Sequence, residues 1–117
     1  MNKDLQIAKK TVQIEINALK KLSTSFNRSS QFSKAVNLIS KTKGKVFVVG
    51  VGKSNMVGNK VSSTLSSLGT PSVAFNAADL QHGDLGAIQK NQDILLVFSV
   101  SGESSELNSI LKYANRY

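Results

Sequence analysis

Three short polar stretches of this 117-residue chain contain residue types that could bind a phosphorylated ligand. "GVGKS" (50–54) combines two glycines with a lysine and a serine, "NAADLQHGD" (76–84) holds the only histidine, and "SVSGESSE" (99–106) places four serines around Gly102. Glycine permits tight turns, and hydroxyls together with the N–H groups at the start of a helix can hold phosphate oxygens. The chemistry that these stretches favour is recognition of a phosphate.

The first stretch is not a nucleotide-binding P-loop, although it ends in Gly-Lys-Ser. That loop requires a further glycine five residues before the glycine that precedes its lysine. Counting back from Gly52, the position is occupied by Phe47, inside an apolar run. Phenylalanine cannot adopt the open backbone conformations of glycine, so this sequence does not predict a P-loop.

Apolar runs precede the polar stretches and are expected to be strands buried on both faces. They are "KVFVV" (45–49), "SVAF" (72–75) and "DILLVFS" (93–99). Helical spacing of apolar residues predicts a helix that starts near Ser54 and is closed by Gly69, and another from Ser104 to the end. A loop-rich crossover over 76–92 joins the second and third strands.

This order of elements predicts an α/β fold with a doubly wound parallel sheet. In open sheets of this kind, ligands bind beyond the carboxyl ends of the strands. Each of the three polar stretches follows a strand. They are therefore expected to converge on one edge of the sheet.

Two amphipathic helices are expected before the first strand. The apolar stripe of the first contains Leu5, Ala8, Val12, Leu19, Leu22 and Phe26, with Ile16 beside it. Ile7 and Ile14 widen this surface, which indicates packing on two sides or against a partner chain. The second helix is expected to have Ser29 or Ser30 as its N-cap and Gly44 just past its end. Residues 1–44 are expected to pack on a domain formed by 45–117.

Charge and composition exclude several classes of function. The net charge is +8, and residues 1–45 account for all of it, with ten Lys/Arg against two acidic groups. These lysines are scattered around two helices, as on a solvated surface, which does not favour nucleic-acid binding. The absence of cysteine excludes disulfides and zinc-thiolate sites. No signal peptide or membrane-spanning run is apparent, so a soluble, cytoplasmic protein is expected.

The motifs "VGVGKSNMVGNKVSSTLSSLGTPS" (49–72), "HGDLGAI" and "SVSGESSEL" together resemble the sugar isomerase (SIS) domain, and specifically the D-arabinose 5-phosphate isomerase family. The similarity covers essentially all of residues 1–117. It implies a three-layer αβα SIS-type sheet. It also implies interconversion of D-ribulose 5-phosphate and D-arabinose 5-phosphate, the first step towards the lipopolysaccharide sugar Kdo.

The resemblance also implies roles for individual residues. An aldose–ketose isomerase moves a proton between neighbouring carbons through an enediolate, so it needs a base, donors for the enediolate oxygen and a phosphate anchor. By position, Lys53, Glu106 and His82 match catalytic residues of the family. Substrate- or phosphate-binding positions are matched by Ser54, Gly69, Thr70, Ser99, Ser101 and Ser104.

Each of these residues also has a structural interpretation. A lone histidine such as His82 is more often structural, and Asp84 could cap a turn. Glu103 and Glu106 are favoured in the first turn of a helix because of its dipole. A serine N-cap beside a tight turn would account for two of the four serines in the last stretch.

The sequence departs from the family in two respects. Asn76 stands where related isomerases carry a histidine associated with an inhibitory zinc, and asparagine is a poor zinc ligand, so we expect neither a metal nor a cofactor. The family domain also continues beyond the position of Tyr117, where this sequence ends. This indicates a truncated product or a chain that works with a second one. Its exposed strand edges are expected to leave it marginally stable and self-associating.

Two alternatives to the isomerase remain open at this point. The first is a non-catalytic phosphosugar-binding SIS module or remnant, which keeps the phosphate site without the full catalytic set. The second is a different aldose–ketose isomerase of the same superfamily.

Overall fold

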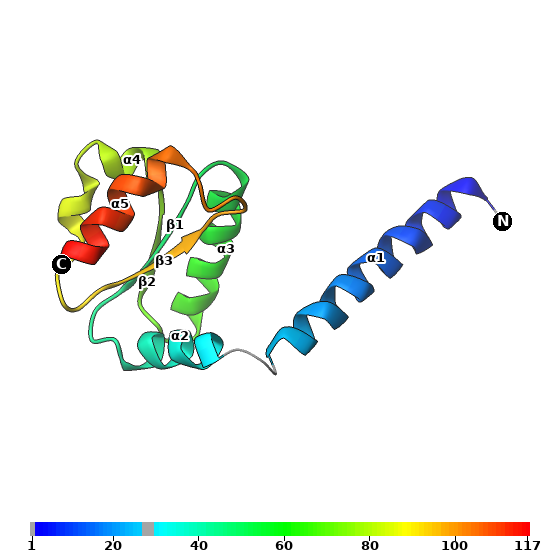
Figure 1. The fold of residues 1–117 in the computed structure, drawn as a ribbon, viewed down its shortest axis with the longest axis horizontal. Coiled ribbons are helices and arrows are strands. Elements are labelled where there is room, and N and C mark those ends of the chain that lie inside the picture. Colours follow the sequence, from blue (N-terminus) through cyan, green and yellow to red (C-terminus); the bar gives the residue numbers. More distant parts are fainter. Residues whose placement is uncertain (1, 27–29) are drawn as a thin grey trace. The chain divides into compact units, whose positions relative to one another are not determined.

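The computed structural model describes residues 2–26 and 30–117. The described residues up to 37 belong to one compact unit, and residues 38–117 form a second. Helix α1 spans Lys3–Phe26 and α2 spans Ser30–Lys41 (Figure 1). Both helices were predicted. Ser30 is the first helical residue of α2 and not its N-cap, and Ser29 lies outside the described residues. Whether residues 1–44 pack on the rest of the chain stays a prediction.

The second unit is built on three parallel strands in the order β2-β1-β3. They are β1 (Val46–Gly50), β2 (Ser72–Asn76) and β3 (Ile94–Phe98). β1 lies in the middle and all five of its residues are buried, whereas every residue of β2 and β3 is partly exposed. The β-branched and aromatic run "VFVV" has the composition expected of a central strand covered on both faces. The three predicted strands and the parallel sheet are confirmed.

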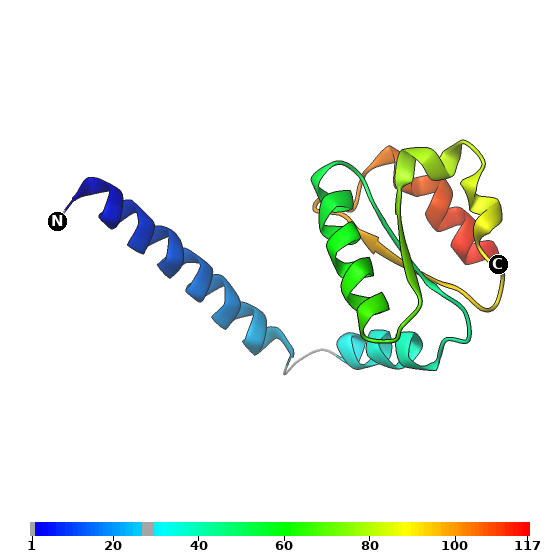
Figure 2. The same ribbon diagram turned by 180° about the vertical axis from the view of Figure 1, so that it is seen from behind.

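Helices cover both faces of this sheet, which gives three layers (Figures 1 and 2). On one face lies α3 (Lys53–Ser67), where the buried Gly58 lies so close to Val48 that an added Cβ would be 3.1 Å from its side chain. On the other face, Val49 packs with residues of α4 (Ala77–Gln81) and α5 (Ser105–Arg116). Successive residues of a strand point to opposite faces, so Val48 and Val49 serve different layers.

The helical structure differs from the sequence prediction in two places. The crossover between β2 and β3 contains the short helix α4 and a 3-10 helix, η1 (Asp84–Ala87). Helix α3 begins one residue earlier than expected, with Gly52 as its N-cap at φ 56°. Glycine takes this left-handed conformation without strain, so Gly52 occupies the cap position and Ser54 lies inside the first turn. Gly69, at φ 89°, closes α3 as predicted.

None of the helices in the described part of the chain combines the length and the apolar composition that a membrane span requires.

Candidate functional site

The carboxyl ends of the three strands define one edge of the sheet. In the parallel register Gly50 pairs with Asn76 of β2 on one side and with Phe98 of β3 on the other. The segments that follow, which carry the three polar stretches, therefore begin side by side (Figure 1). This is the predicted convergence, and it brings together the beginnings of α3, α4 and the loop before α5.

The loop after β1 presents Lys53 to solvent at the first position of α3. The Gly52 carbonyl accepts the N–H groups of Asn55 (3.1 Å) and Met56 (3.3 Å), which fixes the first turn of the helix. Lys53 is exposed and Ser54 is partly buried. A lysine at the start of a helix is not favoured by the helix dipole, so helix stability does not account for its place.

The loop between β3 and α5, residues 99–104, which we call the serine loop, is shaped by its own side chains. Ser99 Oγ accepts the N–H of Gly102 (2.9 Å), and Ser101 Oγ accepts the N–H of Glu103 (3.1 Å). Ser104 is the N-cap of α5 but makes no side-chain capping bond. These two bonds give Ser99 and Ser101 a structural role in the loop. Each hydroxyl that accepts a bond still has its own hydrogen to donate to a phosphate oxygen.

The segment after β2 touches the start of α5. The Gln81 side chain donates to the backbone carbonyl of Glu106 at 2.7 Å, and the Ser105 hydroxyl donates to the Glu106 carboxylate at 3.1 Å. His82 follows Gln81 directly, caps the end of α4 and is exposed. This contact holds the histidine-bearing segment beside the helix that carries Glu106. Asn76 caps α4 by accepting the N–H of Ala78 (3.1 Å), which gives it a structural role.

Gly69 and Thr70 do not join the other candidate residues. They follow α3 and precede β2, so they lie at the amino ends of the strands. Helix α3 has 15 residues and is about 22 Å long, which separates them from Lys53 by that order of distance. Within one copy of the chain, a pentose phosphate could not touch both ends of α3. The assignment of Gly69 and Thr70 stays a prediction.

Two residues of this edge were missed by the sequence analysis. Gln81 joins α4 to α5, and nothing in its sequence context marks it. Asn55 follows the Lys-Ser pair, and its buried Oδ1 has no hydrogen-bond partner among the described residues. Buried polar atoms of this kind are uncommon. The position of an amide beside a glycine-rich turn was the available signal for Asn55.

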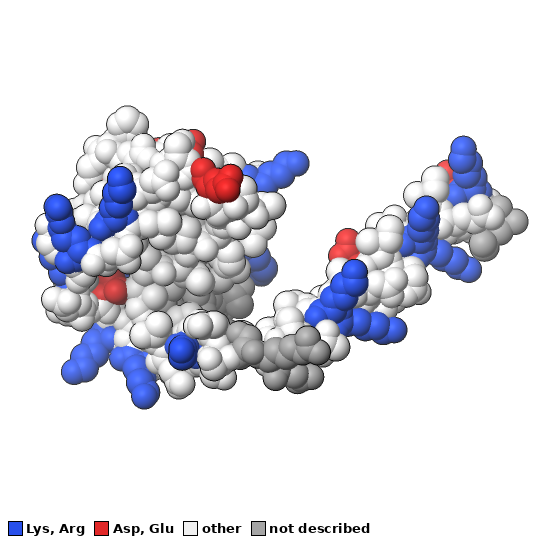
Figure 3. Space-filling model, in the orientation of Figure 1, with Lys and Arg blue, Asp and Glu red and all other residues white. Residues whose placement is uncertain are grey.

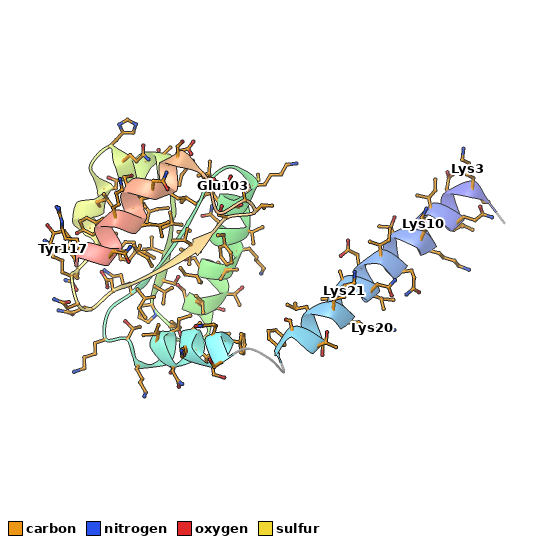
Figure 4. The ribbon with its side chains drawn as sticks, in the orientation of Figure 1. Lys3, Lys10, Lys20, Lys21, Glu103 and Tyr117 are labelled. Carbon is orange, nitrogen blue, oxygen red and sulfur yellow. The ribbon has the colours of Figure 1, made fainter. Side chains whose placement is uncertain are left out.

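Both signs of charge occur at the candidate site. Lys53 begins α3, the acidic Asp84 and Glu106 lie in η1 and α5, and Glu103 is exposed on the serine loop (Figure 4). Within 2–26 and 30–117 no group of three or more His, Cys, Asp or Glu side chains could hold a metal ion. A hollow of about 760 Å³ lies along α5, but none of its lining residues is a candidate site residue.

Comparison with known proteins agrees with this arrangement. A family model described as the SIS domain matches residues 38–116. The chain is 39% identical to the arabinose 5-phosphate isomerase KdsD of Pseudomonas aeruginosa over 109 residues, 93% of this chain and 32% of that protein. It is 43% identical to the arabinose 5-phosphate isomerase KpsF of Escherichia coli over 103 residues, 85% of this chain and 31% of that protein.

Among solved structures, a protein of E. coli CFT073 in complex with arabinose 5-phosphate superposes with a TM-score of 0.84 at 30% identity. The match covers 99% of this chain and 61% of that one. The chain thus spans about one third of the length of the curated relatives that it matches.

Proposed function

Because this chain belongs to the SIS domain family, we propose that it provides part of the active site of a D-arabinose 5-phosphate isomerase. The observation that carries the proposal is the common edge of the sheet, where Lys53 and the serine loop follow neighbouring strands. The reaction interconverts D-ribulose 5-phosphate and D-arabinose 5-phosphate and would serve the synthesis of Kdo and lipopolysaccharide in the cytoplasm. The solved relative bound to arabinose 5-phosphate supports this class of ligand.

The phosphate is assigned to the serine loop and the start of α5. The hydroxyl hydrogens of Ser99 and Ser101 and the side chain of Ser104 can donate to phosphate oxygens. The Leu107 N–H already donates to the Ser104 carbonyl at 3.0 Å, so the N–H groups of Ser105 and Glu106 are the donors assigned to the phosphate at the positive end of the helix dipole. Ser54, in the first turn of α3, is assigned to the sugar. Together these donors would orient the pentose without any metal or cofactor.

The isomerisation transfers one proton between two carbons. A base removes the proton from the carbon next to the carbonyl, which leaves an enediolate, and the proton returns to the neighbouring carbon as the carbonyl moves. We assign the proton transfer to Glu106, assisted by His82 at the substrate oxygens. The Lys53 ammonium would stabilise the negative charge of the enediolate. The contact between Gln81 and Glu106 supports the assignment, because it holds the segments of His82 and Glu106 together.

Hydrogen exchange into the substrate tests this proposal directly. In D₂O, the chain is expected to replace a carbon-bound proton of D-ribulose 5-phosphate by deuterium, which NMR detects even when turnover to the aldose is slow. Lys53→Ala should lower the exchange rate by at least about a hundredfold, the scale of a lost electrostatic contact to the transition state. Lys60→Ala is the matched control, because Lys60 is exposed on the same helix, outside the candidate site. Equal rates for the two variants would contradict the role of Lys53.

A non-catalytic phosphosugar-binding module is the alternative, and the same sample separates the two. Binding of ribulose 5-phosphate without any deuterium incorporation would favour the module. This alternative rests on the extent of the match, which covers 61% of the solved relative's chain and leaves the remaining 39% outside it. In that relative, the part outside the match could supply groups needed for catalysis.

A further inference from the structure

The C-terminal end of α5 borders two neighbouring hollows that the candidate site does not use. The larger hollow has a volume of about 760 Å³, within the range of small-molecule pockets. The smaller one, of about 240 Å³, lies beside it, because Tyr113 and Tyr117 line both. The serine loop lies at the other end of α5, and a helix of 12 residues is about 18 Å long. The hollows are therefore separate from the phosphate site assigned to the start of this helix.

The two tyrosines form an aromatic wall shared by the hollows. Their ring centroids lie 5.0 Å apart, with the ring planes inclined at 54°. The Lys90 ammonium lies over the Tyr117 ring, 3.4 Å from its centroid, and Lys90 lines the smaller hollow and not the larger. This cation–π contact holds the ring from one side. Aromatic side chains on the wall of a pocket can stack with a planar ring of a ligand.

The larger hollow is positively charged. Its lining includes Lys112 and Arg116 and no acidic residue. The two are four positions apart, so they lie on the same face of α5, where a pair of like charges weakens a helix. The helix dipole favours a cation in the last turn, which accounts for Arg116 but not for Lys112. Helix stability alone does not explain this pair.

The concentration of positive charge is local. Residues 46–117 contain five Lys/Arg, and three of them, Lys90, Lys112 and Arg116, line these two hollows. Basic side chains gather at this end of α5 (Figure 3), where Tyr117 lies (Figure 4). The smaller hollow has one acidic residue in its lining, Asp93, and both of its carboxylate oxygens accept backbone N–H groups. The lining thus combines aromatic rings with cations.

We propose that the larger hollow binds a nucleoside monophosphate, whose base stacks on the two tyrosines and whose phosphate lies on Lys112 and Arg116. A phosphate monoester carries about −1.5 to −2 charges, which suits two cations, and the arginine fork bonds two phosphate oxygens at once. Asn115 and Ser109 also line the hollow and offer donors and acceptors to the base and the ribose. A free phosphate ion would leave the aromatic wall uncovered, and an uncharged ring would leave the cations without a partner.

Tyrosine fluorescence of the full chain reports from inside the proposed site. The sequence contains two tyrosines, Tyr113 and Tyr117, and no tryptophan. AMP is therefore expected to quench the emission with a saturating concentration dependence, after correction for its absorbance with free tyrosine. Adenosine and inorganic phosphate, measured by competition with AMP, should bind at least about tenfold more weakly, because each makes only part of the contacts. D-ribulose 5-phosphate has no planar ring and should leave the emission unchanged.

Single substitutions locate the nucleotide on the surface. Arg116→Gln should raise the dissociation constant of AMP at least about tenfold, the effect of a lost hydrogen bond to a charged group. Lys60→Gln is the matched control, because Lys60 is an exposed cation of α3 on the other face of the sheet, and should change it by less than about twofold. Tyr117→Leu should raise it about fivefold or more through lost stacking, with Tyr113 kept as the reporter. Circular dichroism checks that each variant is folded.

Three results would overturn the proposal. The first is the absence of quenching by AMP, or quenching that Arg116→Gln leaves unchanged. The second is binding of inorganic phosphate as tight as that of AMP, which would show that charge alone governs binding. The third is a loss of AMP affinity in Ser99→Ala/Ser101→Ala equal to that in Arg116→Gln, which would place the nucleotide at the serine loop.

Discussion

Gly50 is the position at which one methyl group should disturb the candidate site most. It ends β1, and a Cβ added there would lie 2.7 Å from the backbone N of Asn55 and 2.7 Å from the carbonyl carbon of Ser54. These contacts are with backbone, so no side-chain rotation relieves them. The first turn of α3, which carries Lys53, must therefore shift in Gly50→Ala.

The expected loss of stability follows from two opposing terms. Overpacking of a filled site costs about 1–3 kcal/mol. Gly→Ala at a compatible backbone position gains about 0.4–1 kcal/mol from the unfolded chain. The net effect should be a loss of about 1–2 kcal/mol. With an m-value of about 1 kcal/mol/M in urea, this lowers the unfolding midpoint by roughly 1–2 M.

The assay is urea unfolding followed by circular dichroism, with Gly86→Ala as the control. Gly86 lies in η1, and nothing is within 4 Å of a Cβ added there, so this variant should unfold within about 0.5 M of wild type. Gly50→Ala should lose more free energy of ligand binding than free energy of unfolding, because the shifted turn carries Lys53. An unchanged midpoint and unchanged affinity would refute the close packing of β1 against α3.

Two further substitutions test the fold. Ile110→Ala removes a fully buried side chain of the core and should lower the free energy of unfolding in urea by about 2–5 kcal/mol. Leu111 is 41% exposed, so Leu111→Ala should lower it clearly less. Equal losses would contradict the packing of α5. Asp93→Ala removes the carboxylate that accepts the N–H groups of Lys45 (2.7 Å) and Gln89 (2.6 Å). Asp93→Ala should lower the free energy of unfolding by about 1–3 kcal/mol. A loss below about 0.5 kcal/mol would show that these two hydrogen bonds are not needed for stability.

The sheet could be predicted from sequence because its signals are local and redundant. Runs such as "VFVV" are apolar throughout and consist of β-branched and aromatic residues, which suits a strand covered on both faces. Helix starts were harder to place. The favoured cap types Ser30 and Ser54 both lie inside their helices. At α3, Gly52 with its positive φ is the N-cap in place of Ser54. Helix α4 was missed because five residues are too few to show helical periodicity.

The candidate site was predictable where its residues follow a strand. Lys53, His82 and Ser99 all lie beyond carboxyl ends of strands, as the topology requires. Gly69 and Thr70 precede a strand, so the same rule would have placed them at the opposite edge. The family resemblance grouped them with the others without regard to topology. The local bonds of the serine loop depend on backbone conformation, which residue types alone do not determine.

The central claim, that the edge of the sheet holds a sugar phosphate, is tested most directly by calorimetric titration of the full chain with D-ribulose 5-phosphate and with D-ribulose. The phosphorylated sugar should bind at least about tenfold more tightly, because hydrogen bonds to a charged group contribute about 1.5–3 kcal/mol and 1.4 kcal/mol is tenfold in affinity. Ser99→Ala/Ser101→Ala should remove most of that preference. Equal affinity for the two sugars would contradict the phosphate site and the function built on it.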